Sequence, residues 1–201
     1  MPEERFAHDA FFLDQLVRPI ANLYRISTLG PDGASPGTPL AFVRQKKLKI
    51  KEDIRFFADE SESEELFRIK ARAWLELGGR YDVVVADGTR LGVLEKVFGR
   101  SLLRSTWRVL DENEQEVAFA HEKSVPLAVL RRLIDLVPYG ELVPIVFQFT
   151  IHMDGHQVGE MRRPIGLRDR YILRLDGDPE RRIDRRVAVA FSVALDALQS
   201  R

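Results

Sequence analysis

The C-terminal stretch from Val187 to Leu198 constrains the fold of this chain more than any other segment. It is almost entirely apolar, with bulky residues at helical spacing on one side and valines and alanines on the others, which predicts a helix that is hydrophobic nearly all round. With a rise of ~1.5 Å per residue this stretch is about 18 Å long. A helix needs ~20 apolar residues to cross a bilayer, so this stretch is too short to do so. We therefore expect a central helix over residues 184–198 that is enclosed by protein. Its predicted core residues are Val187, Val189, Ala190, Phe191, Val193, Ala194, Leu195 and Leu198.

Charge and composition narrow the class of protein. The 31 basic and 31 acidic residues cancel, and a chain without a global positive field is a poor nucleic-acid binder, so we expect no nucleic-acid partner. The absence of cysteine excludes disulfides, thiolate metal sites and a cysteine nucleophile. The N-terminus does not resemble a secretory signal and no window is apolar over eighteen residues, so we expect a cytoplasmic protein without a transmembrane span. Its 201 residues suit a single domain, 1–201, and peripheral attachment to a membrane stays open.

Turns built on aspartate recur between β-rich runs. Asp-Gly is a strong hairpin signal because glycine accepts the positive φ that tight turns require. The turns contain Asp32-Gly33, Asp87-Gly88, Asp111 and Asp154-Gly155. We predict four hairpins, which pair residues 23–29 with 40–44, 81–86 with 91–96, 107–110 with 117–123, and 145–152 with 157–163.

Other segments complete this pattern. Residues 48–57, 66–77 and 170–175 are predicted strands, whereas residues 1–21 suit either a short helix or an extended segment. Residues 124–138 are predicted to be a helical insertion, whose apolar stripe we expect to pack over one end of the fold rather than on a membrane surface.

About twelve strands and one apolar helix fit each other in size. An eight-stranded barrel has room for little beyond its own side chains, whereas an eleven-stranded barrel holds a central helix. A strand of five or six residues is about 17 to 20 Å long, close to the helix length. The sequence therefore predicts a mainly β fold, a closed barrel of about twelve strands wrapped around the C-terminal helix, plus one short extra helix. Within that helix we expect Ser192 to bond the carbonyl of Ala188 and Asp196 to reach a barrel mouth.

Several segments resemble a known family. They are Asn22-Leu-Tyr-Arg-Ile26, Tyr81 to Gly88 with Leu91-Gly92, Ser105 to Asp111, Asp169-Arg-Tyr171 and the terminal helix from Asp184. In these segments the chain is similar to the LURP-one-related proteins, which share the tubby C-terminal fold with the phospholipid scramblases. The resemblance implies a twelve-stranded barrel around the C-terminal helix. It implies several functions, since tubby-type domains bind phosphoinositides, scramblases are linked to lipid redistribution, and plant LURP-one proteins are linked to defence.

The chain shows no catalytic signature. It has no Gly-x-Ser-x-Gly, P-loop, Gly-x-Gly-x-x-Gly or His-Glu-x-x-His motif, so we predict no catalytic residues, no enzyme activity and no cofactor. His152 and His156 have metal-like spacing, but a two-residue hairpin pairs Met153 with His156 and turns His152 to the opposite face. We therefore expect no metal site.

Two basic groups are candidates for anion binding. The candidate anion or lipid-headgroup residues are Lys46, Lys47, Lys49, Lys51, Arg162 and Arg163. The lysines at 47, 49 and 51 alternate with apolar residues, so they share one strand face. Their other interpretation is that lysines keep an edge or outer strand soluble and unpaired. The two arginines belong to a zone, 161–186, in which guanidinium groups suit phosphate but also interleave with aspartates that would pair with them.

These observations favour a non-enzymatic binding module. The expected partners are an anionic phospholipid or phosphoinositide, or a protein. The alternative is a scramblase-like protein that affects phospholipid distribution, although the chain lacks the cysteines and the spanning segment of scramblases. Because the helix fills the interior, we expect a ligand to meet the outer surface or the rim of the barrel.

Overall fold

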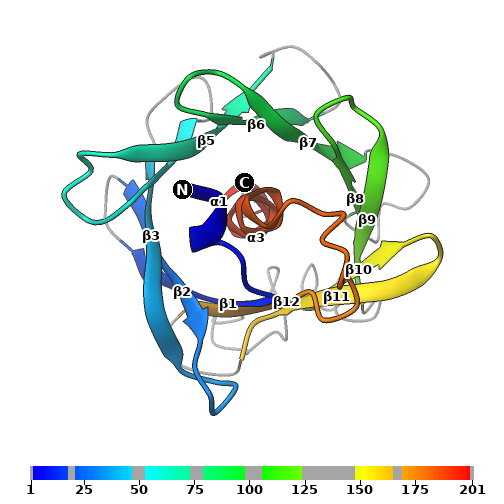
Figure 1. Ribbon diagram of the computed structural model, residues 1–201, viewed down its shortest axis with the longest axis horizontal. Coiled ribbons are helices and arrows are strands. Elements are labelled where there is room, and N and C mark those ends of the chain that lie inside the picture. The colour runs from blue at the N-terminus through cyan, green and yellow to red at the C-terminus, as the bar shows by residue number, and fades with distance from the viewer. Residues whose placement is uncertain are drawn as a thin grey trace, which may run out of the picture.

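Twelve strands form a closed barrel, and the C-terminal helix lies inside it (Figure 1). This computed structural model confirms the predicted fold class. It describes residues 2–17, 21–46, 53–72, 79–97, 106–123, 148–164 and 169–199. The elements are α1 Pro2–Arg5, β1 Ala10–Val17, β2 Ala21–Leu29, β3 Pro36–Lys46, β4 Asp53–Phe57, β5 Glu65–Ala71, β6 Arg80–Val85, β7 Arg90–Val97, β8 Thr106–Leu110, β9 Glu116–Glu122, β10 Gln148–Met153, β11 His156–Arg162, β12 Arg170–Arg174 and α3 Arg185–Gln199.

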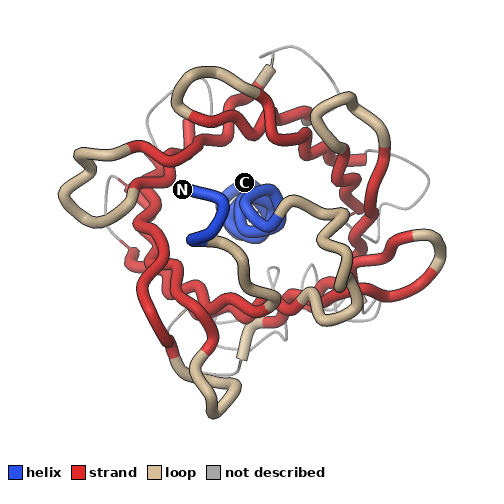
Figure 2. The backbone as a smooth tube through the Cα atoms, viewed as in Figure 1, coloured by secondary structure: helices blue, strands red, loops and turns tan. Residues whose placement is uncertain are grey.

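Each strand is antiparallel to its neighbours in chain order, and β1 closes the barrel by pairing with both β12 and β2 (Figure 2). The register places Phe11 opposite Leu173 and Leu13 opposite Ile26, and all four side chains belong to the core. The N-terminal segment is therefore mainly extended, with α1 as a single helical turn before it. The predicted helical insertion, 124–138, lies outside the described residues.

The Asp-Gly turns have the backbone conformation that the sequence predicts. Gly33, Gly88 and Gly155 have φ angles of 68°, 93° and 81°, in the left-handed region that favours glycine. The predicted pairing of Met153 with His156 across the last of these turns is confirmed. The turn residues thus fix where successive strands reverse.

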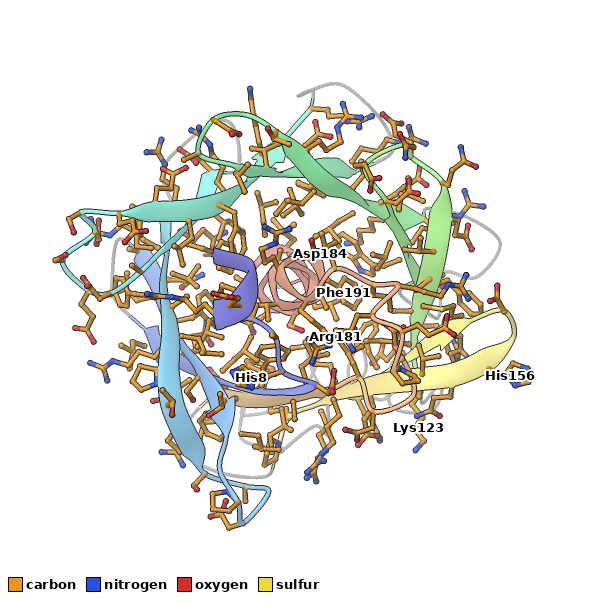
Figure 3. All side chains as sticks on the ribbon, viewed as in Figure 1. His8, Lys123, His156, Arg181, Asp184 and Phe191 are labelled. Atoms are coloured by element: carbon orange, nitrogen blue, oxygen red, sulfur yellow. The ribbon has the colours of Figure 1, made fainter. Side chains whose placement is uncertain are left out.

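Helix α3 fills the middle of the barrel. The residues predicted for its core are all at most 8% exposed. Phe191 meets Trp107 of β8 edge-on, with 6.2 Å between ring centroids. A Cβ at Gly92 of β7 would approach the carbonyl oxygen of Leu110 to 2.6 Å and Val187 Cγ2 to 3.2 Å, so glycine lets the wall close on the helix here. Figure 3 shows side chains from wall and helix filling the space between them.

Helix α3 has one of the polar features predicted for it and one that was not predicted, a cap at Asp184. Asp184 caps its start, because the Asp184 carboxylate accepts a hydrogen bond from the backbone N–H of Arg186 at 2.8 Å. The Ser192 hydroxyl donates to the carbonyl of Ala188 at 3.1 Å, as predicted. In the part of the chain that the structure describes, no helix combines the length and apolar character needed to span a membrane.

Candidate functional site

The two ends of the barrel are built from different connections. Because neighbouring strands are antiparallel and follow chain order, alternate connections lie at opposite ends. The start rim is the end at which α3 begins, and its connections are 30–35, 58–64, 86–89, 111–115, 154–155 and 175–184. The end rim is the opposite end, towards which α3 runs, and its connections are 18–20, 47–52, 72–79, 98–105, 123–147 and 163–169.

Counted along the sequence, the connections assigned to the two rims differ in formal charge. The start-rim connections contain fourteen acidic residues and two basic ones. The end-rim connections contain five acidic residues and twelve basic ones. The chain as a whole is neutral, so the difference in charge arises from how the order of the strands divides the connections between the two ends. A separation of this kind orients a protein towards a charged surface.

The predicted lysines belong to the end rim. β3 ends at Lys46 and β4 begins at Asp53, so Lys47, Lys49 and Lys51 fall in the connection between these strands. Those three residues, and the side chain of Lys46, lie outside the described residues. In the described residues β3 and β4 are each paired on two sides, and the alternative role of the lysines, to keep an edge or outer strand soluble and unpaired, stays a prediction.

Arg162 and Arg163 reach the same rim at another part of the wall. Arg162 is the last residue of β11, and its exposed side chain makes no ion pair with the described residues. Arg163 forms an ion pair with Asp169 across the connection to β12. Three strands separate β11 from β3, which at ~4.8 Å per strand puts these two strands about 19 Å apart around the wall. The topology therefore brings both predicted groups to one rim, at separate positions.

Most arginines between 161 and 186 are paired with aspartates, as their interleaving predicts. The pairs are Arg163–Asp169, Arg170–Asp14, Arg174–Asp176, Arg181–Asp9, Arg182–Asp154, Arg185–Asp178 and Arg186–Asp184. Arg168 lies outside the described residues. Because these partners already neutralise them, the paired arginines are weaker candidates for anion binding than Arg162.

A buried ion pair closes the start rim. Arg185 is 5% exposed and Asp178 is 2% exposed. Arg185 Nη1 lies 2.7 Å from Asp178 Oδ2, and its Nη2 lies 2.7 Å from Oδ1 of Asp9. Asp178 also accepts hydrogen bonds from the backbone N–H groups of Arg182 and Ile183. Buried charges need such partners because their desolvation costs several kcal/mol, on the order of the whole stability of a domain.

At the opposite end of α3, Asp196 is the centre of a partly buried polar cluster. Tyr24 of β2 donates a hydrogen bond to Asp196 Oδ2 at 2.6 Å, and Tyr171 of β12 donates to Oδ1. Gln15 donates in turn to the Tyr24 hydroxyl at 3.3 Å. Burial raises the pKa of Asp196, the two tyrosine hydrogen bonds oppose that shift, and the charge of Asp169 adds to it. Burial beside this carboxyl also raises the pKa of both tyrosines, so they remain protonated donors.

The tyrosine partners of Asp196 were not predicted from the sequence. Tyr24 is 172 residues away and Tyr171 is 25 residues away, so no local pattern joins them to Asp196. The available signal was the carboxyl itself, because an acidic side chain on an enclosed helix requires donors from the surrounding wall. The arrangement anchors the end of α3 to β2 and β12, which gives the cluster a structural role.

The two histidines with metal-like spacing do not converge. His152 lies in a stack of rings on the outer wall, 4.9 Å from His121 and 5.2 Å from Phe119 between centroids. His156 is exposed at the neighbouring turn, where Figure 3 shows it pointing away from the barrel. Within the described ranges, no three His, Cys, Asp or Glu side chains are placed to hold a metal ion.

Fold and site together define a helix-filled antiparallel barrel with two oppositely charged rims. A model of the LURP-one-related (LOR) family matches residues 40–196. The chain therefore belongs to the LURP-one-related family, as the resemblance of its hairpin and helix segments indicated. No curated protein and no solved structure matches it.

Proposed function

We propose that the protein is a non-enzymatic binding module that docks its end rim on anionic phospholipid headgroups, including those of phosphoinositides. The observation that carries this proposal is the charge separation, with twelve basic and five acidic residues in the end-rim connections against two and fourteen at the start rim. An anionic leaflet attracts each nearby lysine or arginine by about 1 kcal/mol. A barrel charged in this way is expected to approach such a leaflet with its end rim first.

The filled interior supports binding at a rim rather than inside the barrel. Val189, Ala190 and Val193 of α3 are 0% exposed. Side chains fill the space between the wall and the helix (Figure 3). A ligand therefore meets the ends or the outer wall.

The buried titratable groups favour binding over catalysis. Asp196 is occupied by the hydroxyls of Tyr24 and Tyr171, and Asp178 is occupied by Arg185. A general acid or base has to reach a substrate proton. Side chains that are enclosed and already paired are poorly suited to that task.

The two alternatives differ in their support. A protein partner with an acidic surface would use the same end rim, and the liposome experiment below separates it from a membrane. A scramblase-like activity has less support, because α3 is enclosed by the wall and its 15 residues extend about 22 Å.

Sedimentation with liposomes tests the proposal. Purified protein is incubated with neutral vesicles and with vesicles of increasing phosphatidylserine or phosphoinositide content, at low and at high salt. We expect pelleting that depends on the anionic headgroup and falls as salt rises, because salt screens the attraction. Absence of pelleting at low salt would contradict membrane binding and leave the acidic protein partner.

A matched pair of variants locates the binding surface. The first variant changes Lys47, Lys49 and Lys51 to glutamine and removes three positive charges from the end rim. The control changes Arg25, Arg108 and Arg182 to glutamine, which removes the same charge from side chains that are 55%, 50% and 46% exposed. We expect the first variant to bind anionic vesicles at least about tenfold more weakly than the control. Equal binding would mean that the end rim is not the docking surface.

A further inference from the structure

Three arginines from three elements converge on one carboxylate at the outer wall. Arg72 follows β5, Arg80 begins β6 and Arg90 begins β7, while Glu114 lies in the turn between β8 and β9. Oε1 of Glu114 lies 2.8 Å from Arg72 Nη2 and 2.9 Å from Arg90 Nη1. Oε2 lies 3.2 Å from Arg72 Nη1 and 3.4 Å from Arg80 Nη1. The three arginine side chains are 21%, 36% and 39% exposed, so a dissolved ligand can reach them.

This cluster needs the negative charge that Glu114 supplies. Asp82 lies 2.7 Å from Arg72, and Glu95 lies 2.7 Å from Arg80. Without Glu114, three guanidinium groups would face two carboxylates. Hydrogen bonding to Arg72 and the charges of the other arginines hold the pKa of Glu114 below its ordinary value. An anion is therefore an integral part of this site.

The backbone at Glu114 is unfavourable for a glutamate. Its φ is 64°, a left-handed conformation that costs an L-residue about 1 kcal/mol and that glycine or asparagine adopts more easily. The turn is held by Asp111, whose carboxylate accepts the backbone N–H groups of Asn113 and Gln115 at 2.9 and 2.8 Å. The contacts of the Glu114 carboxylate with the arginines offset the backbone cost. The turn thus holds the Glu114 carboxylate in position against the arginines.

A carboxylate satisfies these arginines incompletely. Its two oxygens accept from four nitrogens, and the contacts at 3.2 and 3.4 Å lie at or beyond the long limit for N–H···O bonds. A phosphate monoester offers three terminal oxygens and up to two negative charges. Guanidinium groups bind phosphate in a bidentate manner, and several of them can share one phosphate.

We propose that Arg72, Arg80 and Arg90 form a binding site for a phosphate monoester, and that Glu114 occupies this site as an internal competitor until the ligand displaces it. The site lies on the outer wall of β5, β6 and β7. It is distinct from the lysines at 46–51 and from Arg162 and Arg163, although Arg72 is one of the twelve basic residues counted in the end-rim connections. The proposal stands whether or not the end rim binds membranes.

The first test compares Glu114→Gln with Glu112→Gln, a matched change in the same turn. Phenyl phosphate is the probe, and its affinity is measured by titration calorimetry. We expect Glu114→Gln to bind at least about tenfold more tightly than the wild type and Glu112→Gln, because the competing carboxylate is gone. Adding Arg72→Gln to Glu114→Gln should remove this gain. Equal affinity of the two glutamine variants would overturn the proposal.

The second test distinguishes a soluble ligand from a lipid. Vesicles containing phosphatidic acid, a phosphate monoester, are compared with phosphatidylglycerol vesicles, a diester, at matched surface charge. A gain of Glu114→Gln for phenyl phosphate alone indicates a soluble ligand, and a gain for phosphatidic acid vesicles as well indicates a headgroup. If Glu114→Gln does not fold, the wild type is titrated with phenyl phosphate and the Arg72 Nε resonance is followed by NMR. An unchanged resonance at saturating probe would overturn the proposal.

Discussion

The start rim and the end rim of the barrel differ in how their charges are used. At the start rim, acidic side chains build the structure: Asp32 and Asp87 accept backbone hydrogen bonds that shape their turns, and the Asp178 carboxylate is buried against Arg185. At the end rim, the described anchor is the Asp196 cluster, whereas the connections carry an excess of basic residues. Carboxylates that shape turns and bury ion pairs are committed to folding.

This difference indicates which charged residues can bind a ligand without a loss of stability. A charge that folding already uses cannot be changed or occupied by a ligand without a loss of stability. At the end rim, Arg72 and Arg163 form ion pairs, and we expect the other basic residues of these connections to be available to a ligand. The start rim is therefore expected to govern stability and the end rim to govern binding.

The largest loss of stability is expected for a charge introduced into α3, the helix that runs from one rim to the other. Val189 of α3 is 0% exposed, so Val189→Asp would bury an unpaired charge at a cost of several kcal/mol against a total stability of about 5–15 kcal/mol. We expect the variant to be unfolded by circular dichroism and thermal melting. Val97→Asp is the control, since Val97 is 38% exposed and should tolerate the change within about 1 kcal/mol. A cooperatively folded Val189→Asp would mean that α3 is not enclosed.

The next largest loss of stability is expected for the buried ion pair of the start rim, compared with an exposed ion pair. Arg185→Ala leaves Asp178 buried without its guanidinium partner, which should lower the free energy of unfolding by about 3–5 kcal/mol. Arg182→Ala breaks an ion pair whose side chains are 46% and 69% exposed, and should cost less than about 1 kcal/mol. Urea denaturation measures both. Similar losses in the two variants would contradict the assignment of Arg185 to a stabilising network.

A smaller effect is expected at the end rim. Tyr171→Phe removes a hydrogen bond to a partly buried carboxyl, which should lower the free energy of unfolding by about 1.5–3 kcal/mol. The loss should shrink in an Asp196→Ala background, because the donor then has no carboxyl to serve. A full double-mutant cycle by urea denaturation measures this coupling. A coupling energy of zero would show that the tyrosine stabilises the wall without anchoring α3.

The sequence predicted most of the fold because the relevant signals are local. Asp-Gly turns marked the hairpins, and the apolar residues at helical spacing marked α3. The sequence of β1 suits either a helix or an extended segment, because Phe11, Phe12 and Leu13 are all apolar and buried, and a strand buried on both faces lacks the alternation that identifies strands. That missing strand is the one that closes the barrel.

The candidate site could be predicted only in part. The pairing of arginines with nearby aspartates followed from their interleaving along the chain. The contacts of Asp196 with Tyr24 and of Arg185 with Asp9 span 172 and 176 residues, so they exist only through the topology. The difference in charge between the two sets of connections cannot be seen in the neutral composition. It appears only when the strand order assigns alternate connections to opposite rims.

The smallest effect concerns the pH dependence of the end-rim anchor. The pKa of Asp196 is raised above its ordinary 3.8, mainly by burial, so the folded state favours the protonated carboxyl. Its contribution to stability is therefore fully present below the ordinary pKa and is lost as pH rises through the raised pKa. Asp196→Asn cannot titrate, so we expect its free energy of unfolding to fall less than that of the wild type as pH rises from the ordinary pKa through the raised pKa. Urea denaturation at a series of pH values measures the difference. Parallel pH profiles would mean that this carboxyl titrates alike in the folded and unfolded chain, and that the end rim is anchored by packing rather than by a buried acid.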